Sequence, residues 1–238
     1  MRLKEKLSTY LTKLRKRWNT QLAQLKLKTP ICKFCGNPIE SNSFHSLICD
    51  SPKICYKCYS SLTNLWKSFS LDGVKGFGLF RYDDNIRGMI YQFKGCYDYE
   101  LAPIFLEYNK NYFRYKFKNY VVVPAPSSKE SNELRGFNHV IEIFTSLGLE
   151  IIPCIEKIDN VKQSDLSHRE RKSIGSHLNL QNKMLLRNKK VLLCDDVMTT
   201  GSTLKAMIKL VRSCSPKDIK IFVISIRQNA TQIRHEND

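Results

Sequence analysis

One stretch, "VLLCDDVMTTGST" at residues 191–203, constrains the fold of this chain more than any other. An apolar run ends in two adjacent acids, and a loop of hydroxyl side chains and a glycine follows. The run predicts a buried strand that ends at Asp195, and a helix is expected from Ser202. A buried strand that leads through a short loop into a helix indicates an α/β fold.

The same alternation of strands and helices recurs along residues 71–238. Glycines 73, 76 and 78 favour a hairpin or an extended segment. The apolar patterns predict strands at 120–123, 149–152 and 219–226, and helices at 84–94, 99–113, 140–147 and 202–214. This order implies a largely parallel sheet with flanking helices on both faces.

The loop after the expected strand has the chemistry of a phosphate site. In open parallel sheets, ligands bind beyond the carboxyl ends of the strands. Helix N-terminal amides and neighbouring hydroxyls attract an anion, and a glycine lets the backbone approach it. The residues predicted to form this cradle are Thr199, Thr200, Gly201, Ser202 and Thr203.

The two acids before this loop are suited to binding a different part of a phosphate-containing ligand. Asp195 and Asp196 repel a phosphate, but they can accept hydrogen bonds from a sugar diol. They can also hold a magnesium ion that the phosphates of a substrate share. Phosphate loop and acids together predict a site for a ribose 5-phosphate.

Two Cys-x-x-Cys pairs near the N-terminus predict a metal site. Four thiolates at this spacing suit a closed, tetrahedral, structural zinc ion with no open position for catalysis. The predicted ligands are Cys32, Cys35, Cys55 and Cys58. Cys49 and His45 lie between the pairs and are the alternative ligands.

The first 28 residues predict a separate amphipathic helix. They contain no Gly or Pro, and their surface is rich in Lys and Arg. Apolar residues recur every three or four positions, at Leu3, Leu7, Leu11, Leu14, Trp18, Leu22 and Leu25. Two interpretations fit: packing on this protein or a dimer partner, or contact with a membrane surface or nucleic acid. The expected domains are thus residues 1–28, a zinc ribbon at 29–70 and an α/β domain at 71–238.

The charge balance favours a polyanionic partner. The net charge is +17, and residues 1–60 carry +9 of it. Residues 108–120, "YNKNYFRYKFKNY", interleave Tyr and Phe with Lys and Arg, as single-strand binding requires. The alternative is a helix end whose rings are buried. No apolar run is long enough to span a membrane and no secretory signal is visible, so a cytoplasmic location is expected.

These motifs also match a known family. "VLLCDDVMTTGST" closely resembles the motif with which type I phosphoribosyltransferases bind 5-phosphoribosyl-1-pyrophosphate (PRPP). "VVVPAPSSKESNELRGFNH" and "KQSDLSHRERKS" resemble blocks of the ComF family of competence proteins, as does a four-cysteine zinc ribbon ahead of the transferase domain. The chain departs from the family at His139, where Gln is usual, and at Ile174, where Asn is usual.

The resemblance implies roles for individual residues. Asp195 and Asp196 would hold the ribose and its magnesium, and residues 199–203 the 5-phosphate. Ser127 and Lys129 would lie at the pyrophosphate loop, and Arg135 would be a cation on the pyrophosphate side. His139 is a candidate base by residue type alone, and a local hydrogen bond at a helix N-terminus is the favoured alternative.

The resemblance also implies a function. A ComF-like protein would help to bring transforming single-stranded DNA into the cytoplasm, together with the DNA-uptake machinery. It would work in the cytoplasm or peripherally at the inner face of the cell membrane. The alternative is a metabolic phosphoribosyltransferase that transfers ribose 5-phosphate from PRPP to an unidentified nucleophile. Whether the chain is an enzyme stays open at this point.

Overall fold

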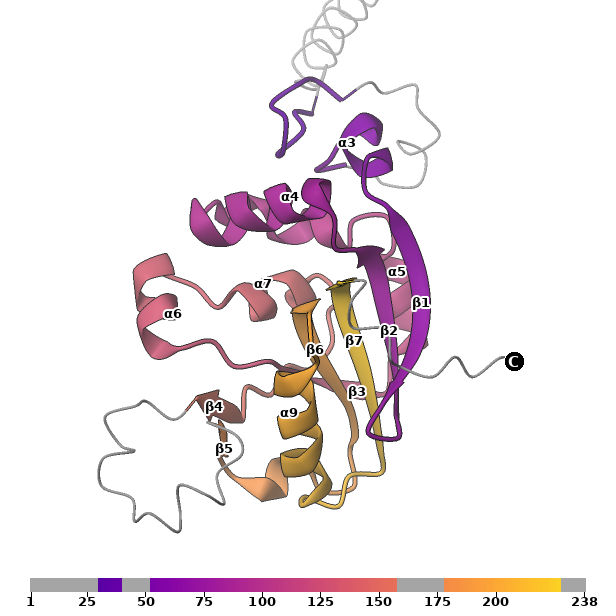
Figure 1. Cartoon of the computed structure of the whole chain (residues 1–238), viewed down its shortest axis with the longest axis vertical. Helices are drawn as coiled ribbons and strands as arrows, with labels where there is room; N and C mark the ends of the chain where they lie inside the picture. Colours follow the sequence, from indigo (N-terminus) through magenta and orange to yellow (C-terminus); the bar gives the residue numbers. More distant parts are fainter. Residues whose placement is uncertain (1–29, 40–51, 158–177, 228–238) are drawn as a thin grey trace, which may run out of the picture.

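Two apolar strands form the centre of the sheet in the computed structural model, which describes residues 30–39, 52–157 and 178–227 (Figure 1). They are β6 (Lys190–Met198) and β7 (Asp218–Ile226), and they pair in parallel. β3 (Tyr120–Pro124) and β2 (Val74–Arg81) flank them in parallel, and β1 (Asn64–Leu71) adds an antiparallel edge. The order β1-β2-β7-β6-β3 confirms the predicted, largely parallel sheet.

Helices cover both faces of this sheet because successive strand residues point to opposite sides. Leu192 and Cys194 of β6 face one hydrophobic cluster, and Val191 and Leu193 face the other. The first cluster is covered by α4 (Asp84–Gly95), the 3-10 helix η1 (Tyr99–Phe105), α5 (Lys110–Lys116) and α7 (His139–Thr145). The second is covered by α9 (Ser202–Arg212).

Three sequence predictions were wrong. The strand expected at 149–152 is reduced to an isolated parallel bridge between Ile151 and Val122. The expected single helix at 99–113 is divided into η1 and α5, and Pro103 inside η1 has no N–H for a continuous α-helix. The strand expected to end at Asp195 continues to Met198, because Val197 and Met198 still pair with β7. Asp195 and Asp196 therefore lie inside the strand and leave the sheet on opposite faces.

β1 and β2 form the hairpin that the glycines favoured. Asp72 and Gly73 both have positive φ, 49° and 75°, as the tight turn between two twisted strands requires. The domain boundary expected after residue 70 falls within this hairpin. Because β1 belongs to the five-stranded sheet, we propose that the α/β domain begins at Asn64.

The cysteine-rich segment packs directly on the sheet domain. It contains the short helix α3 (Tyr56–Ser60), and its apolar side chains join the first cluster, among them Ile39, Ile54 and Leu62. The Tyr108 hydroxyl donates a hydrogen bond to the Ile54 carbonyl at 2.7 Å. The ribbon is thus anchored by shared core as well as by its cysteines.

Four further elements belong to the described residues: α6 (Lys129–Arg135), β4 (Ile155–Lys157), β5 (Leu178–Leu180) and the 3-10 helix η3 (Lys183–Leu186). Among them, β4 and β5 pair as a separate two-stranded sheet. The expected helix at 1–28, the block at 162–173, His45 and Cys49 lie outside the described residues. Among the residues that are described, no helix is both long and apolar enough to cross a membrane.

Candidate functional site

Asp196 is a buried acid near the carboxyl end of β6, and its side chain is only 7% exposed. Lys94 Nζ, from the last turn of α4, donates to Asp196 Oδ2 at 2.8 Å. His139 Nε2 lies 3.5 Å from the same oxygen, and the backbone N–H of Val197 donates to Oδ1 at 2.8 Å. The carboxylate is therefore surrounded by donors and cations from three separate elements.

These partners keep Asp196 ionised. Burial by itself raises the pKa of a carboxyl, because the low dielectric disfavours the charge. Here the contact from His139 and the charge of Lys94 outweigh burial, and the pKa of Asp196 falls well below its usual range. A negative charge is thus fixed inside the site at neutral pH.

Asp195 has a different environment on the other face of the sheet. Its Oδ1 accepts a hydrogen bond from the Asp196 backbone N–H at 2.9 Å. Burial, followed by the nearby charge of Asp196, raises the pKa of the Asp195 carboxyl. The two acids are predicted to act together, but their surroundings differ: the anionic form of Asp196 is stabilised, and that of Asp195 is destabilised.

His139 connects Asp196 to the RGFN segment. Arg135 Nη1 lies 2.8 Å from His139 Nδ1, and Ser127 Oγ lies 3.1 Å from the same nitrogen. A guanidinium can only donate, so Nδ1 accepts and the ring proton sits on Nε2, toward Asp196. Burial lowers the pKa of His139 despite the opposing effect of Asp196, which fits a neutral ring.

A neutral imidazole in this tautomer offers one acceptor and one donor on opposite sides. A glutamine amide offers the same pair. The departure from the family pattern at His139 is therefore conservative in hydrogen bonding. Both ring nitrogens have partners in this network, which reaches from Ser127 to Asp196, so the contacts of His139 are not only local to its helix N-terminus. Its role as a base stays a prediction.

The hydroxyl loop follows β6 and leads into α9. Thr199, Thr200 and Ser202 are exposed, and Thr203 is half-buried. The Thr200 hydroxyl donates to Ser202 Oγ at 3.1 Å. Gly201 has a φ of 73°, and a Cβ there would approach the Leu71 side chain to 3.2 Å, so both the backbone and the packing favour glycine.

The predicted site residues are only partly brought together. Contacts link Ser127, Arg135 and Asp196 through His139, across the ends of β3, α6 and β6. Lys129 begins α6 with its side chain 79% exposed, 4.0 Å from Glu133, and has no contact with that network. Its predicted role and those of the other site residues stay predictions.

Lys94 is the residue that the sequence analysis missed. It is 102 positions from Asp196, and nothing in the local pattern of α4 sets it apart from an ordinary lysine in a last turn. Only the packing of α4 over the carboxyl end of β6 brings its ammonium group into the site. The only sequence signal for Lys94 was its position next to Phe93, on the buried face of the predicted helix.

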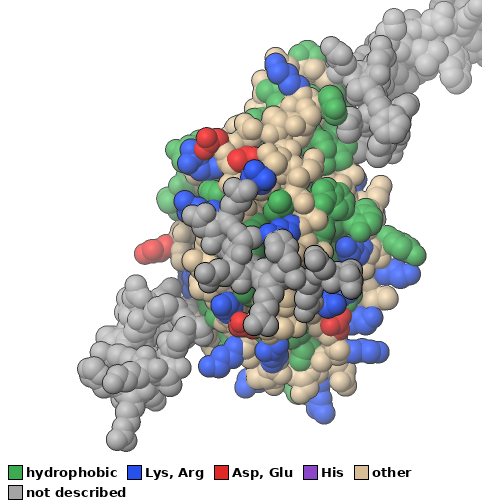
Figure 2. Space-filling view, turned by 45° about the vertical axis from the view of Figure 1, so that its right-hand side comes forward, with side chains coloured by type: hydrophobic (Ala, Val, Ile, Leu, Met, Phe, Trp, Pro, Cys, Tyr) green, Lys and Arg blue, Asp and Glu red, His purple; other side chains and the backbone are tan. Residues whose placement is uncertain are grey.

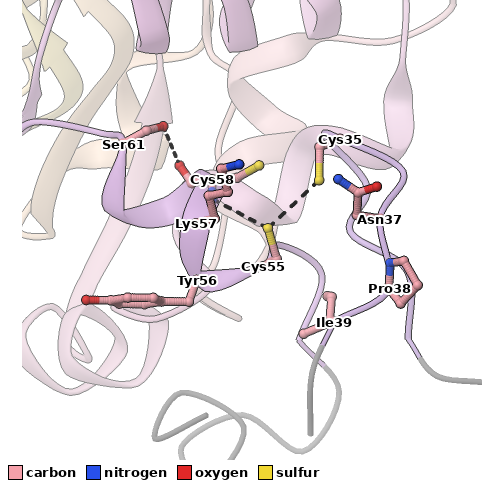
Figure 3. Close-up of a pocket in the computed structure, with 9 residues that line it drawn as sticks. All are labelled: Cys35, Asn37, Pro38, Ile39, Cys55, Tyr56, Lys57, Cys58 and Ser61. Carbon is pink, nitrogen blue, oxygen red and sulfur yellow. Dashed lines mark hydrogen bonds between the residues drawn. The ribbon is translucent and has the colours of Figure 1, made fainter. Parts of the chain in front are cut away.

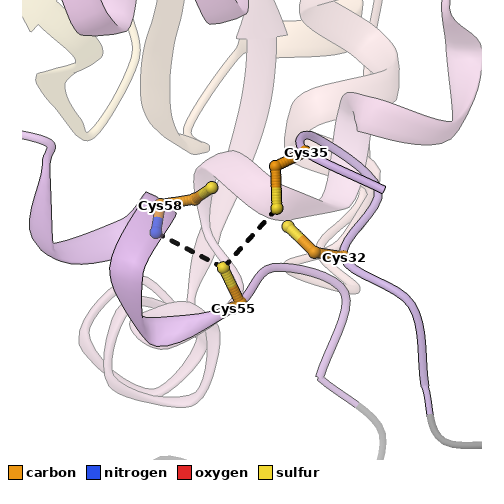
Figure 4. A group of neighbouring side chains, drawn as sticks. All are labelled: Cys32, Cys35, Cys55 and Cys58. Atoms are coloured by element: carbon orange, nitrogen blue, oxygen red, sulfur yellow. Dashed lines mark hydrogen bonds between the residues drawn. The ribbon is translucent and has the colours of Figure 1, made fainter. Parts of the chain in front are cut away.

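Four cysteine sulfurs come together in the ribbon (Figure 4). The thiols of Cys32, Cys35, Cys55 and Cys58 all lie within 4.8 Å of one another, and Cys35 and Cys55 are 3.9 Å apart. Sulfurs bound tetrahedrally to zinc at about 2.3 Å are roughly 3.8 Å apart. The backbone N–H of Cys58 also points to the Cys55 sulfur, at 3.4 Å. The donor set fits a structural metal ion.

A pocket opens beside this cluster (Figure 3). Cys35, Cys55 and Cys58 line it together with Asn37, Pro38, Ile39, Tyr56, Lys57 and Ser61. Three of the four cysteines therefore contribute to the wall of this pocket.

Comparisons with known proteins identify the family. A family model described as "Phosphoribosyl transferase domain" matches residues 138–238. Competence protein ComFC of Streptococcus pneumoniae (strain ATCC BAA-255 / R6) is 30% identical over 152 residues, which cover 63% of this chain and 67% of that protein. Competence protein ComFC of Bacillus subtilis (strain 168) is 28% identical over 181 residues, 75% of this chain and 70% of that protein.

A solved structure of a hypoxanthine phosphoribosyltransferase from Staphylococcus aureus is also similar, at 14% identity and a TM-score of 0.37. The matched region covers 58% of this chain and 68% of the chain in that structure. The sheet order, the family match to residues 138–238 and the close cysteines agree with the predicted phosphoribosyltransferase-like fold behind a ribbon. The chain belongs to the ComFC family of competence proteins and contains a phosphoribosyl transferase domain.

Proposed function

We propose that this chain binds PRPP with magnesium at the carboxyl end of β6, and that it handles single-stranded DNA during natural transformation. The observation that carries the first part is the contact chain from Asp196 through His139 to Arg135 and Ser127. This chain of contacts supports the proposal because it joins an acid, a cation and a hydroxyl near the carboxyl ends of β3 and β6, and the loop that leads into α9 follows β6 directly. The second part rests on membership of the ComFC family.

In this proposal each group recognises one part of PRPP. The amides and hydroxyls of residues 199–203 bind the 5-phosphate, because an exposed helix N-terminus favours an anion. Asp195 and Asp196 accept hydrogen bonds from the ribose diol. Arg135 binds the pyrophosphate side, where a guanidinium can contact two oxygens at once. Ser127 and Lys129 supply further donors on that side.

Magnesium fits the acids by ligand type, since carboxylates and substrate phosphates are its usual ligands. Lys94 already provides a positive charge at Asp196 Oδ2. A metal ion at that oxygen therefore requires the lysine to move, and Lys94 is then free to contact the phosphates. When bound, magnesium neutralises the negative charge on the pyrophosphate of the ligand.

Zinc is the metal we propose for the four cysteines. Ribbons with four cysteine ligands hold zinc tetrahedrally, and the closed donor set leaves no position for a substrate. The ion would stabilise a short segment whose own core is small. Its function here is structural, and the chemistry of PRPP takes place in the sheet domain.

The DNA would come from the uptake machinery on the cytoplasmic side of the membrane. A net charge of +17 favours a polyanion, and the N-terminal 28 residues contribute +8 of it, with 9 Lys or Arg and one Glu. We propose a cytoplasmic location, with residues 1–28 contacting the inner face of the cell membrane. The alternative function, a metabolic phosphoribosyltransferase, keeps the same PRPP site and adds an acceptor nucleophile.

A competition experiment tests the proposal. Calorimetry with PRPP and magnesium, and anisotropy with a labelled oligo(dT), are each repeated in the presence of the other ligand. The proposal expects the full chain to bind both ligands. A chain that binds PRPP and releases pyrophosphate with a nucleobase, yet binds no oligo(dT), supports the metabolic alternative. A folded chain that binds neither contradicts the whole proposal.

A further inference from the structure

Three aromatic side chains stand exposed at the β1 edge of the sheet, away from the contacts of Asp196. Trp66 on β1 is 42% exposed, and Tyr112 and Tyr115 on α5 are 50% and 74% exposed. The Trp66 and Tyr112 rings lie 5.6 Å apart, and Tyr115 follows Tyr112 by three residues, on the same side of the helix. Large rings displayed together in this way are unusual on a soluble protein.

Buried rings form the floor beneath them. Trp66 stacks on Phe113 at 5.7 Å with an interplanar angle of 20°, and it meets Phe77 edge-on at 5.5 Å. Phe77 and Phe113 belong to the main core. The exposed rings are therefore held by a rigid base, which lowers the entropy lost when a ligand stacks on them.

The backbone at Trp66 is strained in a way that displays the ring. Its φ is +43°, in the left-handed region that bulky residues avoid, and the β1–β2 register shifts between Asn64 and Lys67. An irregularity of this kind re-aims a side chain, and such strain concentrates at functional positions.

Cations lie among the rings, and acids are absent from the elements that carry them. Lys116 Nζ is 4.8 Å from the Phe77 ring centroid and 5.3 Å from that of Tyr112. Lys118 Nζ is 5.0 Å from the Tyr115 ring centroid. The sequences of β1, β2 and α5 contain no Asp or Glu. On its right-hand side, Figure 2 shows hydrophobic and Lys or Arg side chains next to one another.

We propose that this aromatic surface, made of Trp66, Tyr112, Tyr115, Lys116 and Lys118, binds single-stranded nucleic acid by base stacking. Exposed bases stack on aromatic rings whatever their sequence, and the lysines contact the phosphates between them. A duplex keeps its bases inside and offers only phosphates. The inference deepens the proposed handling of single-stranded DNA, on which it rests, by assigning it to a surface separate from the PRPP site.

The two lysines and two tyrosines allow a matched test by anisotropy with a labelled 20-nucleotide oligo(dT). Tyr112→Ala/Tyr115→Ala should weaken binding at least about fivefold, the lower end for loss of a stacked base. Lys116→Gln/Lys118→Gln should reduce the salt dependence, log Kd against log salt, by roughly 1.4, about 0.7 for each lost phosphate contact. Tyr91→Ala and Lys205→Gln/Lys209→Gln remove equally exposed side chains elsewhere and should show neither specific effect.

Trp66 itself provides a direct readout, because the chain has only two tryptophans. In a Trp18→Phe variant, oligo(dT) should quench the remaining emission, and an equal concentration of the duplex should quench it much less. If the variant binds oligo(dT) and Trp66 emission does not change, the strand binds elsewhere and this inference is wrong, while the proposed function stands. If the full chain binds no oligo(dT), the proposed DNA function fails first. If Trp66 emission changes with protein concentration in the absence of DNA, the surface contacts a second copy of the chain, and this inference is wrong.

Discussion

Lys94 Nζ and Asp196 Oδ2 form an ion pair of 2.8 Å between the last turn of α4 and the end of β6. The acid is nearly buried, whereas the lysine side chain is 34% exposed. The pair supplies the positive charge that a buried carboxylate needs. It also occupies the oxygen at which the proposed ribose or metal contact would form, so ligand binding and this ion pair compete.

Lys94→Met should therefore destabilise the fold. Loss of one partner from a fully buried pair costs about 3–5 kcal/mol, and the exposure of Lys94 reduces this to about 1–3 kcal/mol. Urea unfolding measures the loss. Asp196→Asn in the same chain should recover most of it, since the buried charge is then gone. Lys205→Met, at an exposed lysine on α9, is the control and should change little. Equal stability of all these variants would show that the pair contributes nothing.

The neutral state of His139 predicts a pH dependence of stability. Burial lowers the pKa of the folded histidine below its ordinary 6.5, so the unfolded chain takes up more protons as the pH falls through 6.5. The free energy of unfolding should decrease on acidification from pH 7.5 to 5.5, at most by about 1.4 kcal/mol per pH unit from this residue.

His139→Gln should remove this part of the pH dependence, because the amide keeps one donor and one acceptor and does not titrate. Urea unfolding at pH 7.5 and 5.5 compares the two proteins. His139→Leu, which has neither group, should instead lose stability at both pH values. A wild-type protein and a Gln variant with the same pH slope would show that His139 is not held neutral by its surroundings.

The sequence predicted the parts of this fold that depend on local patterns. The apolar runs located β3, β6 and β7, and the two Cys-x-x-Cys pairs located the four close cysteines, because the spacing within each pair is a local pattern. It misplaced the end of β6, since the pairing of Val197 and Met198 with β7 is a long-range contact. It also missed Lys94, whose partner is set by the packing of a helix over the sheet.

For the segment 108–120, which interleaves aromatic and basic residues, the sequence likewise could not predict which rings are buried by long-range packing. Phe113 and Phe117 are buried in the core, whereas Tyr112 and Tyr115 are exposed. The alternative of buried rings therefore holds for the two phenylalanines, and single-strand binding by the two exposed tyrosines stays a prediction. The sequence could not assign them, and it gave no sign that Trp66, some 50 residues earlier, lies against them.

The cysteine cluster predicts about one zinc ion per chain in purified protein. Cys55→Ser/Cys58→Ser should lose the metal and much of the soluble yield, because the ribbon shares its apolar residues with the main core. Cys96→Ser removes an exposed cysteine outside the cluster and should keep full zinc content. Elemental analysis decides the matter, and a double variant with full zinc would place the ligands elsewhere.

Residues 1–28 can be tested by deletion of that segment. If they bind a membrane surface, the shortened chain should lose binding to vesicles that contain anionic lipids, measured by co-sedimentation at low salt. PRPP binding should be unchanged, because no residue of the proposed site is removed. Unchanged vesicle and oligo(dT) binding after the deletion would assign these residues to packing on this protein or on a partner.

The most direct test of the PRPP site is calorimetry with PRPP and magnesium on an Asp195→Ala/Asp196→Ala variant. Alanine accepts no hydrogen bond from the ribose diol and carries no charge for the cation. Two lost charged hydrogen bonds of about 1.5–3 kcal/mol each predict a loss of about 100- to 10,000-fold in affinity. Asp84→Ala/Glu156→Ala removes two exposed acids elsewhere and should bind PRPP as the wild type does. Circular dichroism shows that each variant is folded, and a folded Asp195→Ala/Asp196→Ala chain with wild-type PRPP affinity would contradict the proposed site.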